Sequence, residues 1–181
     1  MATAGRLLRV QGYHATGLNQ IIEDSQAPKG SLYHYFPKGK EELACEAMVE
    51  AGKKMGGRLR SLMEDSPRDA LAKLVELTIQ DLEESDYRDG CPIATVSLET
   101  TNTSPQLQAV CAGIFQSALT MIEAWLIKLG LDREQAASLA ITTFSAYEGA
   151  LMLSKVRRDT EPLKQVSQQL AHILSTYTKQ S

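Results

Sequence analysis

The 181-residue chain is poor in the residues that mark disulfide-stabilised, fibrous or membrane-spanning proteins. Its three cysteines, Cys45, Cys91 and Cys111, are odd in number and far apart, so we expect reduced thiols in a cytoplasmic protein. Glycine and proline together make up about a tenth of the residues, which excludes collagen-like and low-complexity chains. Because the chain has no run of about 18 apolar residues, we predict no transmembrane helix. The composition indicates a soluble globular protein.

Residue constellations for metal binding or catalysis are also missing. The three histidines, His14, His34 and His172, are scattered, and no two have the spacing of metal ligands. The chain contains no glycine-rich phosphate loop, no Gly-x-Ser-x-Gly sequence and no plausible catalytic triad. We therefore expect no metal, no cofactor and no enzymatic activity.

The charge is unevenly distributed along the chain. Residues 1–40 hold five basic and two acidic side chains, a net charge of +3, whereas the remainder has a net charge of −6. This asymmetry leaves room for a local DNA-binding face on an acidic protein. A chance fluctuation of three charges explains the difference equally well.

Helical periodicity, interrupted by glycine or proline, runs through nearly the whole chain and predicts an all-α fold. Thr16 is placed to cap the second helix, and Asp132 with Gln135 resembles a capping box for the eighth. Cys45 and Cys111 fall on apolar helical faces, where we expect small core residues. We predict about nine helices, one ending at residue 12 and the others spanning about 16–25, 28–35, 40–64, 67–85, 92–99, 105–129, 132–156 and 160–177.

The second and third predicted helices form a candidate helix-turn-helix. Two short helices are joined by a tight turn, and the second ends in aromatic residues followed by lysines. Leu32 and Phe36 would face the core, while the outward side chains would reach phosphates, base edges or thymine methyl groups. The alternative is that the aromatic residues are ordinary packing. The predicted DNA-binding residues are Thr16, Lys29, Gly30, Ser31, Tyr33, His34 and Lys40.

One ordered run of residues resembles a known family. The segments Gly-Tyr-His-Ala-Thr at 12–16 and Ala-Pro-Lys-Gly-Ser-Leu-Tyr-His-Tyr-Phe-Pro at 27–37 are similar to the DNA-binding domain of the TetR family of transcriptional repressors. The extra residue in Pro37–Leu43 and the Gly-Cys-Pro-Ile-Ala sequence at 90–94 resemble the LmrA/YxaF-like branch, which contains lincomycin- and flavonoid-responsive repressors. Gly17 departs from the Ser or Thr of many members. Met1 aligns inside the family's first helix, so the numbering begins after that helix's polar first turn.

The resemblance implies a ligand-responsive repressor that is dimeric through its last two long helices. We expect a DNA-binding domain over residues 1–44 and a helical ligand-binding and dimerisation domain over residues 45–181. As a homodimer the protein would place its recognition helices in successive major grooves of a pseudo-palindromic operator and be released by a small effector. Its partners would be double-stranded operator DNA, the effector and a second copy of itself.

Residue types guide the choice of effector and dimer sites in the second domain. Ligand pockets are mostly apolar with a few polar groups, and rings at Phe115, Trp125 and Tyr147 favour an apolar or aromatic effector. The predicted effector residues are Thr78, Ile93, Phe115, Gln116, Leu119, Ile122, Trp125, Thr143, Tyr147 and Leu151. The last two helices show more apolar surface than a monomer needs, and the predicted interface residues are Ala136, Ala140, Gly149, Leu163, Val166, Leu170 and Ile173.

Two other functions remain open at this point. The chain could be a helical small-molecule binder whose helix-turn-helix only packs, which a DNA-binding assay would distinguish from a repressor. It could also be a small all-α enzyme, although the sequence offers no acid–base or metal constellation.

Overall fold

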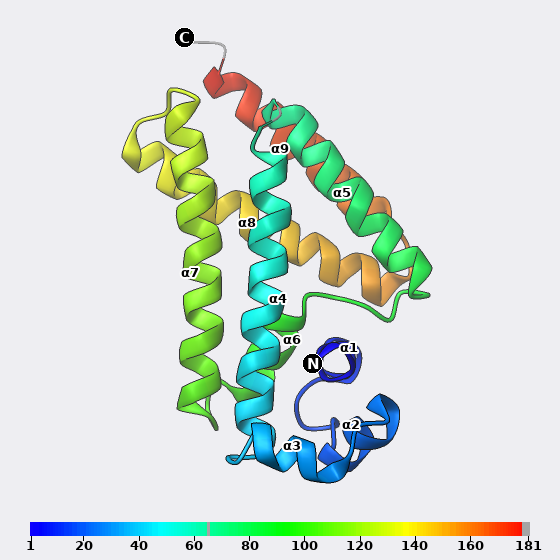
Figure 1. Cartoon of the computed structure of the whole chain (residues 1–181). Helices are drawn as coiled ribbons and strands as arrows, with labels where there is room; N and C mark the ends of the chain where they lie inside the picture. The colour runs from blue at the N-terminus through cyan, green and yellow to red at the C-terminus, as the bar shows by residue number, and fades with distance from the viewer. Residues whose placement is uncertain (65, 179–181) are drawn as a thin grey trace. The chain divides into compact units, whose positions relative to one another are not determined.

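The computed structural model describes residues 1–64 and 66–178, and the regular secondary structure of this part is helical throughout (Figure 1). The order and approximate bounds of the helices confirm the all-α prediction. The helices are α1 (Ala2–Gln11), α2 (Leu18–Ser25), α3 (Lys29–Tyr35), α4 (Lys40–Leu62), α5 (Pro67–Glu84), α6 (Pro92–Thr100), α7 (Pro105–Lys128), α8 (Arg133–Arg157) and α9 (Glu161–Thr178).

Helix ends follow the local chemistry, with one correction. Asp132 and Gln135 form the predicted capping box at the start of α8. The prediction that Thr16 caps α2 was wrong, because the N-cap residue is Gly17 and makes no side-chain cap. The Thr16 hydroxyl is fully buried and donates instead to the Gly12 carbonyl, 2.6 Å away. Thr16 therefore fastens the turn after α1 rather than the start of α2.

The chain divides into two compact units. Unit 1 comprises Met1–Lys54 and Cys91–Phe115, and unit 2 comprises Met55–Gly90 and Gln116–Ser181. The chain passes from unit 1 to unit 2 along α4, returns with α6 and leaves again along α7. These units group residues by packing, and the functional division at residue 44 remains a prediction.

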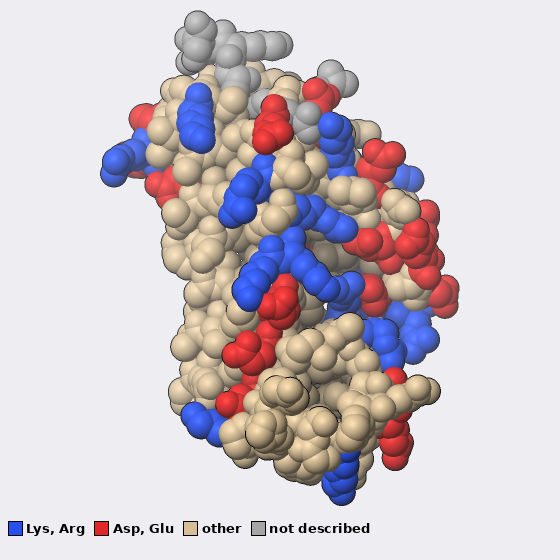
Figure 2. Space-filling view, viewed as in Figure 1, with Lys and Arg blue, Asp and Glu red and all other residues tan. Residues whose placement is uncertain are grey.

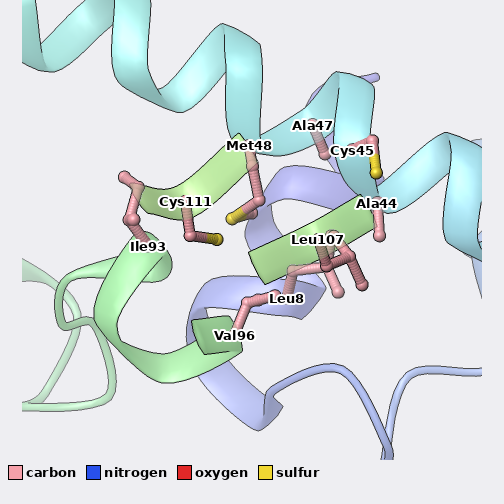
Figure 3. Packing of buried hydrophobic residues seen from close by; sticks show 9 residues of the cluster. All are labelled: Leu8, Ala44, Cys45, Ala47, Met48, Ile93, Val96, Leu107 and Cys111. Atoms are coloured by element: carbon pink, nitrogen blue, oxygen red, sulfur yellow. The ribbon is translucent and has the colours of Figure 1, made fainter. Parts of the chain in front are cut away.

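Unit 1 holds two apolar clusters that share α1. Leu7 of α1 belongs to a cluster that joins α1, α2, α3 and the start of α4, with buried members Ala4, Leu7, Ile21, Leu32 and Leu43. The neighbouring Leu8 belongs to a second cluster, seen in Figure 3, that joins α1, α4, α6 and α7. Its buried members are Leu8, Ala44, Cys45, Ala47, Met48, Ile93, Val96, Leu107 and Cys111. The helix-turn-helix segment is therefore packed, through α1 and α4, against α6 and the first half of α7.

The second cluster confirms that Cys45 and Cys111 are small core residues. Burial disfavours the thiolate and raises the pKa of both thiols, that of Cys111 to about 11. Both thiols therefore stay protonated near neutral pH and are poor nucleophiles there.

Unit 2 is built around α9, which packs against both α5 and α8. Its apolar cluster contains the buried residues Leu71, Ile122, Leu126, Leu131, Ala136, Leu139, Ala140, Leu170 and Leu174, with Trp125 and Phe144 packed against it. Helix α7 has the length and apolar composition of a membrane span, as core helices of soluble proteins also do. It contributes Leu107 and Cys111 to the core of unit 1 and Ile122 and Leu126 to that of unit 2.

Candidate nucleic-acid interface

Helix α3 has one buried anchor and an exposed outer side. Leu32 is 7% exposed and lies in the first cluster of unit 1, and half-buried Phe36 packs against the same cluster. These contacts confirm the prediction that Leu32 and Phe36 face inward. Tyr33 and Tyr35 are 47% and 72% exposed, so they are not ordinary core aromatics. The α3 backbone is thus fixed by its inner face, while its rings remain available to a partner.

The remaining predicted contact residues of α3 lie on or near the surface. Lys29, Gly30 and His34 are exposed, and Ser31 is half-buried. A side chain at Gly30 would meet no atom within 4 Å, so this position leaves the backbone accessible. Figure 2 shows a largely uncharged surface over α2 and α3, with both basic and acidic side chains at its edges. This arrangement suits a helix that reads bases with polar and aromatic groups while lysines meet phosphates.

The turn between α1 and α2 is fixed by a residue far away in the sequence. Glu99, near the end of α6, accepts a 2.8 Å hydrogen bond from the His14 amide, and the His14 Nε2 lies 3.3 Å from the Glu99 carbonyl oxygen. Gly12 makes this approach possible, because a β-carbon there would collide with the Glu99 Oε1. Gly12 also has φ 79° and ψ −175°, a conformation essentially restricted to glycine.

Lys40, at the start of α4, packs on the same turn. Its Nζ lies 4.3 Å from the centre of the Tyr13 ring and 3.5 Å from the His14 carbonyl oxygen. Burial lowers the pKa of the Lys40 ammonium, and the Glu99 carboxylate opposes that effect. In this conformation Lys40 stabilises the turn, and its contact with phosphate remains a prediction.

Sequence reasoning missed two links to the DNA-binding segment, one from α6 and one from the connection between α6 and α7. One is Glu99, and the other is Ser104, whose hydroxyl donates to the Glu41 carboxylate at the start of α4. In each of the two hydrogen bonds, Glu99–His14 and Ser104–Glu41, the bonded residues are more than 60 positions apart in the sequence. No local spacing pattern therefore predicts either bond. Gly12 was a visible signal, since a glycine with positive φ often accommodates a close neighbour.

The predicted effector residues are divided between the two units. In unit 2, the hydroxyls of Thr78 on α5 and Tyr147 on α8 are 2.7 Å apart. Ile122, Thr143 and Leu151 are buried in that unit, Leu119 and Trp125 are half-buried, and Gln116 is exposed. Ile93 and Phe115 instead belong to unit 1, where they pack in or against its second cluster. The effector assignment remains a prediction; eight of its ten residues lie in unit 2, where Thr78 and Tyr147 are in direct contact.

Most of the predicted dimer residues fill the interior of unit 2. Ala136, Ala140, Leu163 and Leu170 are at most 4% exposed, while Gly149, Val166 and Ile173 are half-buried. The exposed apolar side chains of α8 are others, namely Ile141, Met152, Leu153 and Val156, which are 49–77% exposed. Helical periodicity alone did not separate the inner from the outer apolar face, because α8 is apolar on both.

Comparison with known proteins identifies both parts of the chain. Residues 1–47 match the family described as "Bacterial regulatory proteins, tetR family", and residues 67–169 match "Transcriptional regulator LmrA/YxaF-like, C-terminal domain". The chain is 39% identical over 170 residues to the uncharacterised HTH-type transcriptional regulator YxaF of Bacillus subtilis, covering 93% of this chain and 89% of that protein. It is 33% identical to the HTH-type transcriptional regulator LmrA of Bacillus subtilis, covering 96% and 94%.

The fold is also shared with solved structures. A TetR regulatory protein from Rhodobacter sphaeroides superposes with a TM-score of 0.84 at 18% identity, covering 94% of this chain and 96% of that one. The reduced form of Escherichia coli NemR gives a TM-score of 0.79 at 21% identity, covering 93% and 91%.

Proposed function

Because the chain belongs to the TetR family, in its LmrA/YxaF-like branch, we propose that it is a cytoplasmic repressor released from DNA by a small apolar or aromatic effector. The family consists of transcriptional regulators, which confirms the expectation that the chain is not an enzyme. The observation that supports operator binding most directly is the exposed outer side of α3 around its single buried anchor, Leu32.

The outer residues of α3 have distinct roles in this proposal. Lys29 contacts a phosphate near the N-terminus of the helix, where free amides add to the attraction. Tyr33 and His34 reach base edges or sugar, and Gly30 lets the backbone approach the DNA closely. Ser31, Thr16 and Lys40 complete the predicted contact set. Thr16 contributes through the position of its turn, since its hydroxyl is bonded to Gly12.

A homodimer supplies the two recognition helices that a pseudo-palindrome requires. The exposed apolar residues of α8, rather than its buried ones, support an interface there: Ile141, Met152 and Val156 recur at intervals that share one side of the helix. Gly149, Val166 and Ile173 lie at half-buried positions of α8 and α9, where they would meet a partner at the edge of this surface.

Effector release follows from differential binding. An effector that binds the DNA-free conformation more tightly than the operator-bound one shifts the population towards the free form, typically by 1–3 kcal/mol of coupling. The proposed effector residues in unit 2 are Thr78, Gln116, Leu119, Ile122, Trp125, Thr143, Tyr147 and Leu151.

Selection from a random duplex library tests operator binding without knowledge of the genome. We expect enrichment of an inverted repeat whose half-sites are about one helical turn apart, bound with a strong salt dependence. A library that shows no enriched sequence would instead favour the small-molecule binder whose helix-turn-helix only packs.

A further inference from the structure

Two buried hydroxyl groups of α8, those of Thr143 and Ser154, have no hydrogen-bond partner among the described residues, unlike other helical hydroxyls of the chain. The Oγ1 of Thr143 and the Oγ of Ser154 are inaccessible to solvent and form no hydrogen bond within the described part of the chain. Other helical hydroxyls donate to the carbonyl one turn earlier, as Thr78, Thr100 and the adjacent Thr142 do. A buried hydroxyl without a partner is unfavourable, because it has lost its hydrogen bonds to water and gained none in the protein. The hydroxyls of Thr143 and Ser154 are thus each able to donate a hydrogen bond to a further group.

Thr143 lies beside a hydrogen-bonded pair that joins α5 to α8. Thr78 has one hydroxyl hydrogen, which it donates to the Leu74 carbonyl at 2.7 Å. Tyr147 must therefore donate its own hydrogen to the Thr78 oxygen, 2.7 Å away. Thr143 precedes Tyr147 by one helical turn on the same face of α8. Of these three hydroxyls, that of Thr143 keeps a hydrogen with no acceptor.

The composition of the buried residues indicates what kind of group would accept that hydrogen. Every buried polar residue among the described side chains is a serine or threonine, and none carries a charge. An ionic ligand would have no buried counter-charge, and its desolvation would be costly. The same unit supplies the rings of Trp125 and Phe144, packed against its apolar cluster. These features favour a neutral ligand that carries an oxygen acceptor on an apolar ring system.

We propose that the Thr143 hydroxyl, next to the Thr78–Tyr147 pair, is the donor that recognises a carbonyl or ether oxygen of a neutral, ring-containing effector. This inference rests on the proposed function, because it defines the chemistry of the effector site. Ser154 lies eleven residues further along, about 16 Å by helical rise, and falls outside the reach of the same oxygen. It serves as the distance control.

A pair of ligands that differ by one carbonyl tests the proposal. The tricyclic ketone 9-fluorenone and its parent hydrocarbon fluorene are compared by equilibrium dialysis, with fluorene-2-carboxylate as the ionic probe. We expect the wild-type protein to bind the ketone about five- to tenfold more tightly than the hydrocarbon, the value of one net hydrogen bond. The carboxylate should bind more weakly than either.

Substitutions then locate the donor. Thr143→Val should abolish the preference for the ketone, whereas Thr143→Ser should retain it. Thr142→Val, which removes an exposed and partnered hydroxyl, and Ser154→Ala should both leave it unchanged. Without ligand, Thr143→Val should raise the melting temperature by roughly 2–4 °C, because the isosteric methyl group removes an unsatisfied hydroxyl.

Several results would overturn the proposal: no binding of either neutral probe, equal affinity for both, a ketone preference that survives Thr143→Val, or a melting temperature that falls in this variant. Binding to the selected DNA duplex is measured on the same ligand-free proteins. If that binding is present while the ketone preference is absent, the Thr143 proposal fails and the proposed repressor function stands. If DNA binding itself is absent, the repressor function fails whatever the dialysis shows.

Discussion

The two compact units differ in how they use their buried hydroxyls and their apolar surface. In unit 1 each of the buried hydroxyls, those of Thr16, Thr100 and Ser104, has a hydrogen-bond partner. In unit 2 those of Thr143 and Ser154 have none among the described residues. Unit 2 also exposes the apolar side chains of α8. The buried hydroxyls of unit 1 are thus satisfied within the unit, whereas the buried hydroxyls and exposed apolar side chains of unit 2 are the features on which the proposed effector site and subunit interface depend.

The largest expected effect concerns Ile93, which sequence reasoning assigned to the effector site. Ile93 is 1% exposed in the second cluster of unit 1. We expect Ile93→Ala to reduce the free energy of unfolding by about 2–5 kcal/mol, as large-to-small substitutions in well-packed cores do. Denaturant unfolding measures the loss, and Leu119→Ala, at a half-buried position of unit 2, is the control with a smaller expected loss. An Ile93→Ala protein of unchanged stability but weakened effector binding would return Ile93 to the effector site.

The next prediction compares the loss of stability on substituting two glycines of unit 1, both of which have positive φ. Gly12 and Gly39 have φ 79° and 77°, but only Gly12 faces a side chain, that of Glu99. Gly39→Ala should cost about 1–2 kcal/mol from the left-handed backbone alone. Gly12→Ala would also displace the Glu99 carboxylate from its bond to His14, so we expect roughly 3 kcal/mol and weaker operator binding. Equal losses in the two variants would show that the Glu99 contact does not fix this turn.

Tyr33 tests whether the outer side of α3 reads DNA. Because Tyr33 is exposed while the adjacent Leu32 is buried, Tyr33→Ala should leave folding intact. We expect operator affinity to fall by about 1–3 kcal/mol if the ring or hydroxyl contacts a base. Fluorescence anisotropy with the selected duplex measures the affinity, and circular dichroism checks the fold. An unfolded variant would mean that Tyr33 is a packing residue after all.

A smaller effect is expected for the exposed apolar surface of unit 2. Val156 on α8 is 77% exposed, and Leu98 on α6, in unit 1, is 84% exposed. A lysine at an apolar subunit interface is unfavourable, so Val156→Lys should raise the dimer dissociation constant at least tenfold, about 1.4 kcal/mol. Leu98→Lys should leave it unchanged. Sedimentation velocity over a concentration series provides the measurement, and identical behaviour of the two variants would remove α8 from the interface.

Local patterns in the sequence specified the helices well, because their ends depend on nearby residues. The capping box at Asp132 and the inward positions of Leu32 and Phe36 required only spacing and periodicity. Long-range partners were beyond such reasoning. The Glu99–His14 contact links residues 85 positions apart, and α6 packs with unit 1 although the chain reaches it through unit 2. For the same reason the sequence did not indicate that Ile93 packs in the core of unit 1, apart from the predicted effector residues of unit 2.

The smallest expected effect concerns two lysines of unit 1, Lys29 and Lys53, which carry the same charge but should contribute differently to DNA binding. Lys29 is exposed at the start of α3, whereas Lys53 is exposed on α4 and forms a 2.7 Å ion pair with Glu50. Each phosphate contact contributes about 0.9 to the slope of log affinity against log salt concentration. Lys29→Ala should therefore flatten this slope by about one and weaken binding to all duplexes alike, because a phosphate contact reads no base. Lys53→Ala should leave both quantities unchanged, since its charge lies outside the reading surface and is already paired. A salt titration of binding to the selected duplex and to a scrambled one measures both the slope and the affinity.

A Lys29→Ala protein that keeps the wild-type slope but loses its preference for the selected duplex would instead show that Lys29 reads a base.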